Sequence, residues 1–342
     1  MRLIDLRSDT VTKPGAAMRR AMADAEVGDD ERDGDPTTLL LEQRVARLLG
    51  KERALFFPSG VMANQSAIHL LARPGTEVLI DWDTHIFEGE KAGVAALSGA
   101  QIRPVTPSGV IATADDMRRH LRPKARQDTR ASLVCVENTH NGAGGRVVSL
   151  DEMRAIRAFA TEELLPVHLD GARLWNASIA SGVPLADFAA CADTVMVAFS
   201  KGLGAPIGAA VASSAAAAEE LWGIRKRFGG AMRQSGIIAA AALYALDHNL
   251  DRLSEDHANA RELARLVEGA GGASVVTPDT NIVMIDLPDG RAAQRVTEQC
   301  AIDGVLFAAW SPTRIRAVTH LDVSAAQVRT AAETLARVLE RA

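Results

Sequence analysis

The sequence is poor in the features that mark secreted, membrane-spanning or nucleic-acid-binding proteins. Its 342 residues hold three cysteines, far apart and odd in number, which does not fit a disulfide framework or a cysteine metal cluster. Acidic residues (43) outnumber basic ones (38), so no positive surplus favours nucleic acid or an anionic membrane. The N-terminus lacks a signal-peptide core, and no apolar run reaches the length of a membrane span. We expect a reducing, cytoplasmic location.

What is present is an ordinary globular pattern. Apolar residues make up 47% of the chain, ample for the cores of one large and one small domain. Apolar runs of strand length alternate with segments of helical period, which is typical of α/β folds with a mainly parallel sheet and helices on both faces. The predicted strands are 54–57, 77–81, 132–137, 167–170, 194–199 and 208–212. The predicted helices are 37–49, 61–71, 151–161 and 215–227.

The last third of the chain predicts a smaller unit. Residues 235–269 contain few helix breakers and predict one long helix that leaves the main domain. Beyond it, three segments predict a smaller sheet and two predict helices that cover it. The strand segments are 273–287, 304–308 and 314–319, and the helices are 291–303 and 324–341.

Lys201 and Asp170 carry the strongest chemical signal. Lys201 follows a predicted strand in the turn Ser200-Lys201-Gly202-Leu203-Gly204, and Asp170 ends the strand before it. Pyridoxal phosphate (PLP) needs an amine for a Schiff base and a carboxylate that keeps its pyridine nitrogen protonated. Alone, each residue would more often be a solvated lysine or a turn aspartate. As a pair they predict a PLP site.

Two other segments fit the same cofactor. Phe57-Pro58-Ser59-Gly60-Val61 joins a strand to a helix, and the free N–H groups of such a helix start bind phosphate. His85 follows another strand, at the sheet edge where ligands of open α/β sheets collect, and its ring is placed to stack on the pyridine. A plain capped turn and a structural histidine are the alternatives.

Eight ordered segments, spanning nearly the whole chain, resemble the low-specificity L-threonine aldolases. They are Leu6-Arg7-Ser8-Asp9-Thr10-Val11-Thr12, Val27-Gly28-Asp29-Asp30, Asp35-Pro36-Thr37, Phe57-Pro58-Ser59-Gly60, Glu137-Asn138-Thr139-His140, His168-Leu169-Asp170-Gly171-Ala172-Arg173, Ser200-Lys201-Gly202-Leu203 and Gly229-Gly230-Ala231-Met232-Arg233-Gln234. The resemblance implies a fold-type I PLP enzyme of the β-eliminating lyase group, with an aspartate aminotransferase-like, three-layer large domain (1–250) and a small α+β domain (251–342). It also implies that residues 1–30 reach the active site and that the protein is a homotetramer with shared sites.

The resemblance also implies roles for individual residues. Lys201 would bind PLP covalently, Asp170 would face the pyridine nitrogen, and His85 would stack on the ring. The other cofactor contacts would come from Ser59, Gly60, Val61, Arg173, Ser200 and, from a neighbouring subunit, Arg233. Ser8, Arg173 and Arg316 would grip the substrate carboxylate, since arginine forks fix the orientation of carboxylates. Thr10 and Thr12 lie where some relatives place a cation, but a structural turn explains them and no metal is assigned.

The implied activity is that of a carbon–carbon lyase. It would cleave L-threonine, L-allo-threonine and other β-hydroxy-α-amino acids between Cα and Cβ, giving glycine and an aldehyde. Two alternatives stay open: a PLP-dependent lyase or dehydratase that expels a β-substituent, and a non-catalytic PLP-binding protein. A small amino acid is the expected substrate, with neither nucleic acid nor membrane as a partner.

The chain departs from the family pattern near the expected substrate. Gly89 stands where an aromatic residue is usual, Gln127 near a family histidine, and Arg32 where tyrosine is common; the single tyrosine of the chain is Tyr244. Glu88 is interpreted as a replacement base or as a surface residue. Glu137 and Asn138 are interpreted as an active-site edge or as an ordinary strand end.

Overall fold

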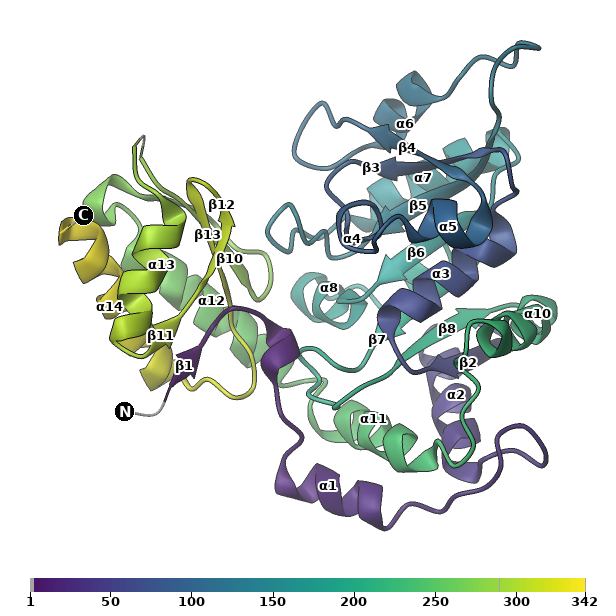
Figure 1. Cartoon of the computed structure of the whole chain (residues 1–342), viewed down its shortest axis with the longest axis horizontal. Helices are drawn as coiled ribbons and strands as arrows, with labels where there is room; N and C mark the ends of the chain where they lie inside the picture. Colours follow the sequence, from purple (N-terminus) through teal and green to yellow (C-terminus); the bar gives the residue numbers. More distant parts are fainter. Residues whose placement is uncertain (1–2, 289, 342) are drawn as a thin grey trace.

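The computed structural model describes residues 3–288 and 290–341. Its larger part is built on a seven-stranded sheet in the order β2-β8-β7-β6-β5-β3-β4 (Figure 1). The strands are β2 (Arg53–Phe57), β3 (Glu77–Asp81), β4 (Gln101–Val105), β5 (Ala131–Glu137), β6 (Val167–Gly171), β7 (Thr194–Ala198) and β8 (Ala209–Ser213). In this sheet β8 is antiparallel to both neighbours and the other pairs are parallel. The predicted mainly parallel α/β sheet is confirmed.

Helices cover both faces of this sheet, and the alternation of side chains along each strand explains why. On β2, Phe56 belongs to one core cluster, whereas Leu55 and Phe57 belong to the cluster on the opposite face. The Phe56 face is covered by α2 (Pro36–Leu48), α7 (Leu150–Glu162), α8 (Leu174–Ser181), α9 (Leu185–Ala189) and α11 (Gly236–His248). The Leu55 face is covered by α3 (Gly60–Leu71) and α10 (Ala215–Arg227), with α5 (Gly93–Ser98) farther along. The predicted three layers are therefore present.

Edge elements and short helices escaped prediction. β4 lies at the edge of the sheet, and Gln101, Arg103 and Pro104 dilute its apolar pattern, as is usual for an edge strand. The short helices show too few turns for a period to be recognised. They include α1 (Ala16–Ala23), α4 (His85–Glu88) and α6 (Ala114–His120).

The prediction of one helix over 235–269 is wrong. The chain forms α11, a turn at 249–252, and then α12 (Leu253–Val267). The turn contains neither glycine nor proline, so a search for breakers misses it. Asn249 ends α11, and its side-chain amide donates to the carbonyl oxygen of Leu203 at 2.8 Å, which ties this turn to the Lys201 loop.

The smaller part holds an antiparallel sheet in the order β12-β13-β10-β9, packed on α12, α13 and α14 (Figure 1). Its elements are β9 (Ser274–Val276), β10 (Ile282–Asp286), α13 (Ala293–Ile302), β12 (Ala308–Ser311), β13 (Arg314–Val318) and α14 (Ala325–Arg341). The predicted sheet segment 273–287 therefore contains two antiparallel strands joined by a loop. The predicted strand 304–308 is likewise divided between β11 (Val305–Leu306) and β12.

The N-terminus is built into this smaller part. β1 (Ile4–Asp5) pairs in parallel with β11, and Ile4 and Leu6 are buried in the same core as α12 and α14. The 3-10 helix Asp9–Val11 follows and leads the chain toward the large sheet. Both termini thus lie on the smaller part (Figure 1). Within the described residues, no helix combines the length and apolarity that a membrane span requires.

Candidate active site

A cavity of about 170 Å³ lies beyond the carboxyl ends of β5, β6 and β7. It brings together predicted site residues from distant segments, namely Ser8, His85, Asp170, Arg173, Lys201 and Arg316. Thr10, Glu137, Thr139, Asn141 and Ala172 complete its wall. Carboxyl ends of parallel strands are where open α/β sheets bind ligands, so the topology accounts for this gathering.

Other predicted cofactor residues are not in the cavity wall of the described chain: Ser59, Gly60, Val61, Ser200 and Arg233. The Ser59 hydroxyl caps α3 by accepting from the Met62 N–H at 3.2 Å. Arg233 is exposed and pairs with Glu31 and Asp29 of its own chain. Their cofactor roles remain predictions.

Lys201 is held by its backbone, and its side chain is largely enclosed at the cavity wall. The Thr12 hydroxyl lies 3.0 Å from the Lys201 carbonyl oxygen and 3.0 Å from that of Asp9, so Thr12 has a structural role here. Burial, followed by the charge of Arg173, lowers the pKa of Lys201 to about 8. A neutral amine is the nucleophile toward a carbonyl, and this lysine gives up its proton far more readily than an exposed one.

Asp170 is buried and fixed by two donors. Asn64 Nδ2 donates to one carboxylate oxygen at 2.8 Å and the Ala172 N–H to the other at 3.0 Å. Behind Asn64, His168 Nε2 lies 3.0 Å from Asn64 Oδ1, and burial lowers the pKa of His168 to about 4. A neutral histidine therefore holds the amide that orients Asp170. Sequence reasoning missed Asn64, whose place inside a helix gives no sign of this contact.

Arg173 reaches the cavity already paired. Its Nε and Nη2 donate to the two oxygens of buried Asp9 at 2.8 and 2.7 Å, and Asn281 donates to Asp9 at 3.1 Å. Burial would raise the pKa of Asp9, but the charge and hydrogen bonds of Arg173 outweigh it and hold that pKa well below its usual range. Nη1 of Arg173 remains directed to Asn141 Oδ1 at 3.4 Å. The two-pronged guanidinium contact predicted for the substrate carboxylate is thus made with Asp9 instead. Only Nη1 of Arg173 is directed toward Asn141 at the cavity.

Arg316 is the second guanidinium. Its Nη1 donates to Asn141 Oδ1 at 3.1 Å, and it stacks 4.5 Å over the Trp310 ring. Its buried Nε has no hydrogen-bond partner in the described structure. Burial, then the charge of Arg173, lowers the pKa of Arg316 to about 10. Arg173 is already paired with Asp9, but the neutral Asn141 Oδ1 does not compensate the charge of Arg316, which leaves the place suited to an anion.

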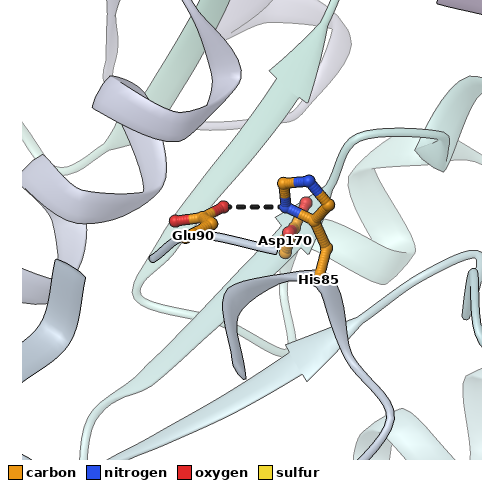
Figure 2. A group of neighbouring side chains, drawn as sticks. All are labelled: His85, Glu90 and Asp170. Atoms are coloured by element: carbon orange, nitrogen blue, oxygen red, sulfur yellow. Dashed lines mark hydrogen bonds and ion pairs between the residues drawn. The ribbon is translucent and has the colours of Figure 1, made fainter. Parts of the chain in front are cut away.

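His85 is oriented by a carboxylate that the sequence interpretation did not single out. Its Nδ1 lies 3.0 Å from Glu90 Oε1, and the hydrogen bond to Glu90 raises the pKa of His85 against the effect of burial (Figure 2). The His85 backbone N–H donates to Glu137 at 2.6 Å, and Glu137 also accepts from the Asn141 N–H at 2.7 Å. Burial and the neighbouring Asp170 raise the pKa of Glu137. Glu137 therefore both shapes and lines the cavity.

His85, Glu90 and Asp170 place ligand-type atoms within 4.8 Å of one another (Figure 2). The carboxylate oxygens already accept hydrogen bonds from Asn64, Gln65 and the Ala172 N–H. These contacts account for the cluster as a hydrogen-bonded network, without a metal ion.

The structure shows which of the other residues singled out from the sequence lie at the cavity and which do not. The Asn138 side chain turns to the backbone of Val148 and is structural, whereas Glu137 is at the cavity. Glu88, Gln127 and Arg32 are exposed and outside the cavity wall described here. A Cβ on Gly89 would lie 2.9 Å from the His85 ring, so this position controls where the imidazole sits.

Residues 5–289 match the family model described as "Beta-eliminating lyase". The low-specificity L-threonine aldolase 1 of Arabidopsis thaliana is 38% identical over 96% of this chain and 94% of its own length. Among solved structures, a Leishmania major threonine aldolase superposes with a TM-score of 0.84 at 19% identity, covering 98% of this chain and 99% of its own. A structure of SPT with PLP gives a TM-score of 0.76 at 21% identity, over 98% and 87% of the two chains.

Proposed function

The chain belongs to the β-eliminating lyase family, and from this premise we propose that it is a PLP-dependent aldolase acting on L-threonine, L-allo-threonine and other β-hydroxy-α-amino acids. The products are glycine and an aldehyde. The observation that carries the proposal is a single cavity in which a lysine with a lowered pKa and a buried aspartate face a pair of arginines.

The residues of the cavity fit PLP. Lys201 supplies an amine with a lowered pKa, and Asp170 supplies a carboxylate fixed by Asn64. When bound, PLP supplies an electron sink for the pair of electrons left at Cα. Ser59, Gly60, Val61 and Ser200 would hold its phosphate, the first three at the start of α3 and Ser200 beside the lysine.

The substrate carboxylate binds between Arg173 and Arg316 in this proposal. It would replace the Asn141 oxygen that bridges them, with the Ser8 hydroxyl as a further donor from the same wall. Asp9 fixes the plane of Arg173, so the carboxylate is held in one orientation. That orientation decides which bond at Cα is aligned for cleavage.

His85 is proposed to take the β-hydroxyl proton at Nε2, directly or through water, while its ring stacks on the cofactor. An imidazole has a pKa suited to this transfer near neutral pH. Its neighbour Glu137 closes the same wall.

The test is to supply L-threonine and L-allo-threonine to the PLP-loaded protein and to quantify glycine, acetaldehyde, 2-oxobutanoate and ammonia together. Equal amounts of glycine and acetaldehyde support the proposal. 2-Oxobutanoate with ammonia would replace it with β-elimination. A PLP-loaded protein that turns over no β-hydroxy amino acid in a broad panel would favour a non-catalytic role.

We also propose that the protein is a cytoplasmic homotetramer in which Arg233 contacts the phosphate of a neighbouring site. Exposed apolar side chains on adjacent helices support an interface: Leu39 and Leu40 on α2 and Ile237 on α11. Arg233 is exposed just before α11. Light scattering of Arg233→Ala and of the native protein, with their PLP affinities, tests both parts; a monomer that binds PLP tightly contradicts them.

A further inference from the structure

Glu90 is a buried carboxylate for which neither the sequence nor the proposed reaction supplies a role. Its side chain is 0% exposed and accepts from Asn64 Nδ2 at 2.9 Å, Gln65 Nε2 at 2.6 Å and His85 Nδ1 at 3.0 Å. Two of these donors are neutral amides, so His85 is the partner among them that can carry positive charge. A buried carboxylate is costly, and neutral packing would be cheaper if it served the fold alone.

The backbone around Glu90 is also held in an uncommon conformation. Lys91 and Ala92, which follow it, both have left-handed φ angles, of 54° and 58°. Such angles are rare outside glycine and persist only where surrounding structure imposes them. Here they turn the chain into α5 immediately after Glu90, with the carboxylate directed inward toward Asn64 and Gln65 of α3.

We propose that Glu90 is a positioning residue that holds the His85 imidazole with Nδ1–H toward Glu90, so that Nε2 faces the cavity as the proton-accepting atom. Figure 2 shows the second ring nitrogen pointing away from Glu90. A carboxylate accepts hydrogen bonds only, which fixes the proton on Nδ1 in the neutral ring. The assignment of Nε2 as proton acceptor rests on the proposed aldolase function; the orientation of the ring does not.

Asn64 makes this arrangement part of a larger one. Its Nδ2 donates one hydrogen bond to Glu90 and one to Asp170. The amide oxygen, Oδ1, is then left to interact with His168. Asn64 thus contacts Asp170, which would face the cofactor nitrogen, and also Glu90, which holds the His85 ring that would stack on the cofactor. The other charged groups facing His85 are Asp170 at the end of β6, Lys201 after β7 and Glu137 at the end of β5.

The first test needs no cofactor and no activity. Long-range ¹H–¹⁵N NMR of ¹⁵N-histidine-labelled apoprotein reports the tautomer and titration of each of the eight histidines, with His85 assigned from its loss in His85→Asn. We expect the Nδ1–H tautomer in the native protein, and in Glu90→Gln a titration moved to lower pH and a mixed tautomer. An Nε2–H tautomer in the native protein overturns the proposal even if Glu90→Gln does not fold.

The second test separates positioning from structural support. With PLP loaded, Glu90→Gln should lower kcat roughly 10- to 100-fold, the range found when a metal-bound histidine loses the partner that orients it. In the His85→Asn background the same substitution should cost little, because the two residues act as a unit. Equal losses in both backgrounds would overturn the proposal. Glu219→Gln, which removes an exposed carboxylate, is the matched control and should change neither readout.

Discussion

At the scale of single residues, the buried pair Asp9–Arg173 makes the sharpest prediction. Asp9→Asn keeps the shape but leaves Arg173 as an uncompensated buried cation, which should cost about 3–5 kcal/mol of unfolding free energy. The amino acid would still meet a cationic site, but in a less fixed orientation, so kcat should fall more than KM rises. Urea unfolding and steady-state kinetics measure the two effects.

Asp5→Asn is the control for this substitution. Asp5 pairs with Arg7 at 2.6 Å, but the Arg7 side chain is 53% exposed, and a solvated pair contributes less than about 1 kcal/mol. If both variants lost the same stability, the pairing with Arg173 would not be what Asp9 supplies.

The residues that sequence reasoning found and missed differ in one physical respect. Lys201 and Asp170 follow strands directly, so the strand pattern places them at the sheet edge. Asp9, Asn64 and Glu90 act through partners far along the chain, and no local pattern shows which carboxylate or amide will be buried. Such residues resemble solvated or capping groups until the tertiary contacts are known.

At the scale of helices and strands, the start of α3 can be tested against that of α10. Ser59→Ala removes a helix cap, which should cost about 1 kcal/mol, and weakens PLP binding if the phosphate lies there. Ser214 caps α10 through the Ala217 N–H at 3.3 Å. However, α10 follows the antiparallel strand β8, so it begins at the opposite ends of the strands from the cavity. Ser214→Ala should therefore cost similar stability and leave PLP affinity unchanged. Melting of apoprotein and PLP titration measure both; equal PLP affinities would contradict the phosphate site.

Elements were predictable where the apolar pattern was continuous. The ranges of β3 and α10 agree with prediction: the apolar run of β3 is unbroken, and the single glycine of α10, Gly223, does not end a helix that begins with four alanines. The turn between α11 and α12 was not predictable, since it depends on the tertiary contact of Asn249 with the Lys201 loop. The loop between β9 and β10 likewise supplies Asn281 to Asp9. Turns and loops of this kind hold residues of the site in place through tertiary contacts, which local helix and strand propensities do not predict.

At the scale of the whole molecule, the N-terminal segment and α12 connect the two cores. The division near residue 250 stays a prediction; in the structure it falls in the turn before α12, while Ile4 and Leu6 pack with the C-terminal core. Asn176 of α8 and His257 of α12 meet across this connection at 3.1 Å. The resemblance implied that residues 1–30 reach the site, and Ser8 and Thr10 lie in the cavity wall.

The contact between α8 and α12 makes stability depend on pH. Burial lowers the pKa of His257 to about 4, below the 6.5 of an unfolded histidine. Its contribution is therefore fully present above pH 6.5 and is lost as pH falls toward 4, by up to roughly 3 kcal/mol. His257→Gln keeps an acceptor for Asn176 but does not titrate, so its unfolding free energy should fall less over this window. His168 and Asp256 titrate in both proteins and cancel in the difference. Urea unfolding of both proteins at several pH values from 7 to 4 measures this difference in unfolding free energy. Parallel curves would show that His257 takes up no proton on unfolding, and therefore that its pKa is not lowered in the folded protein.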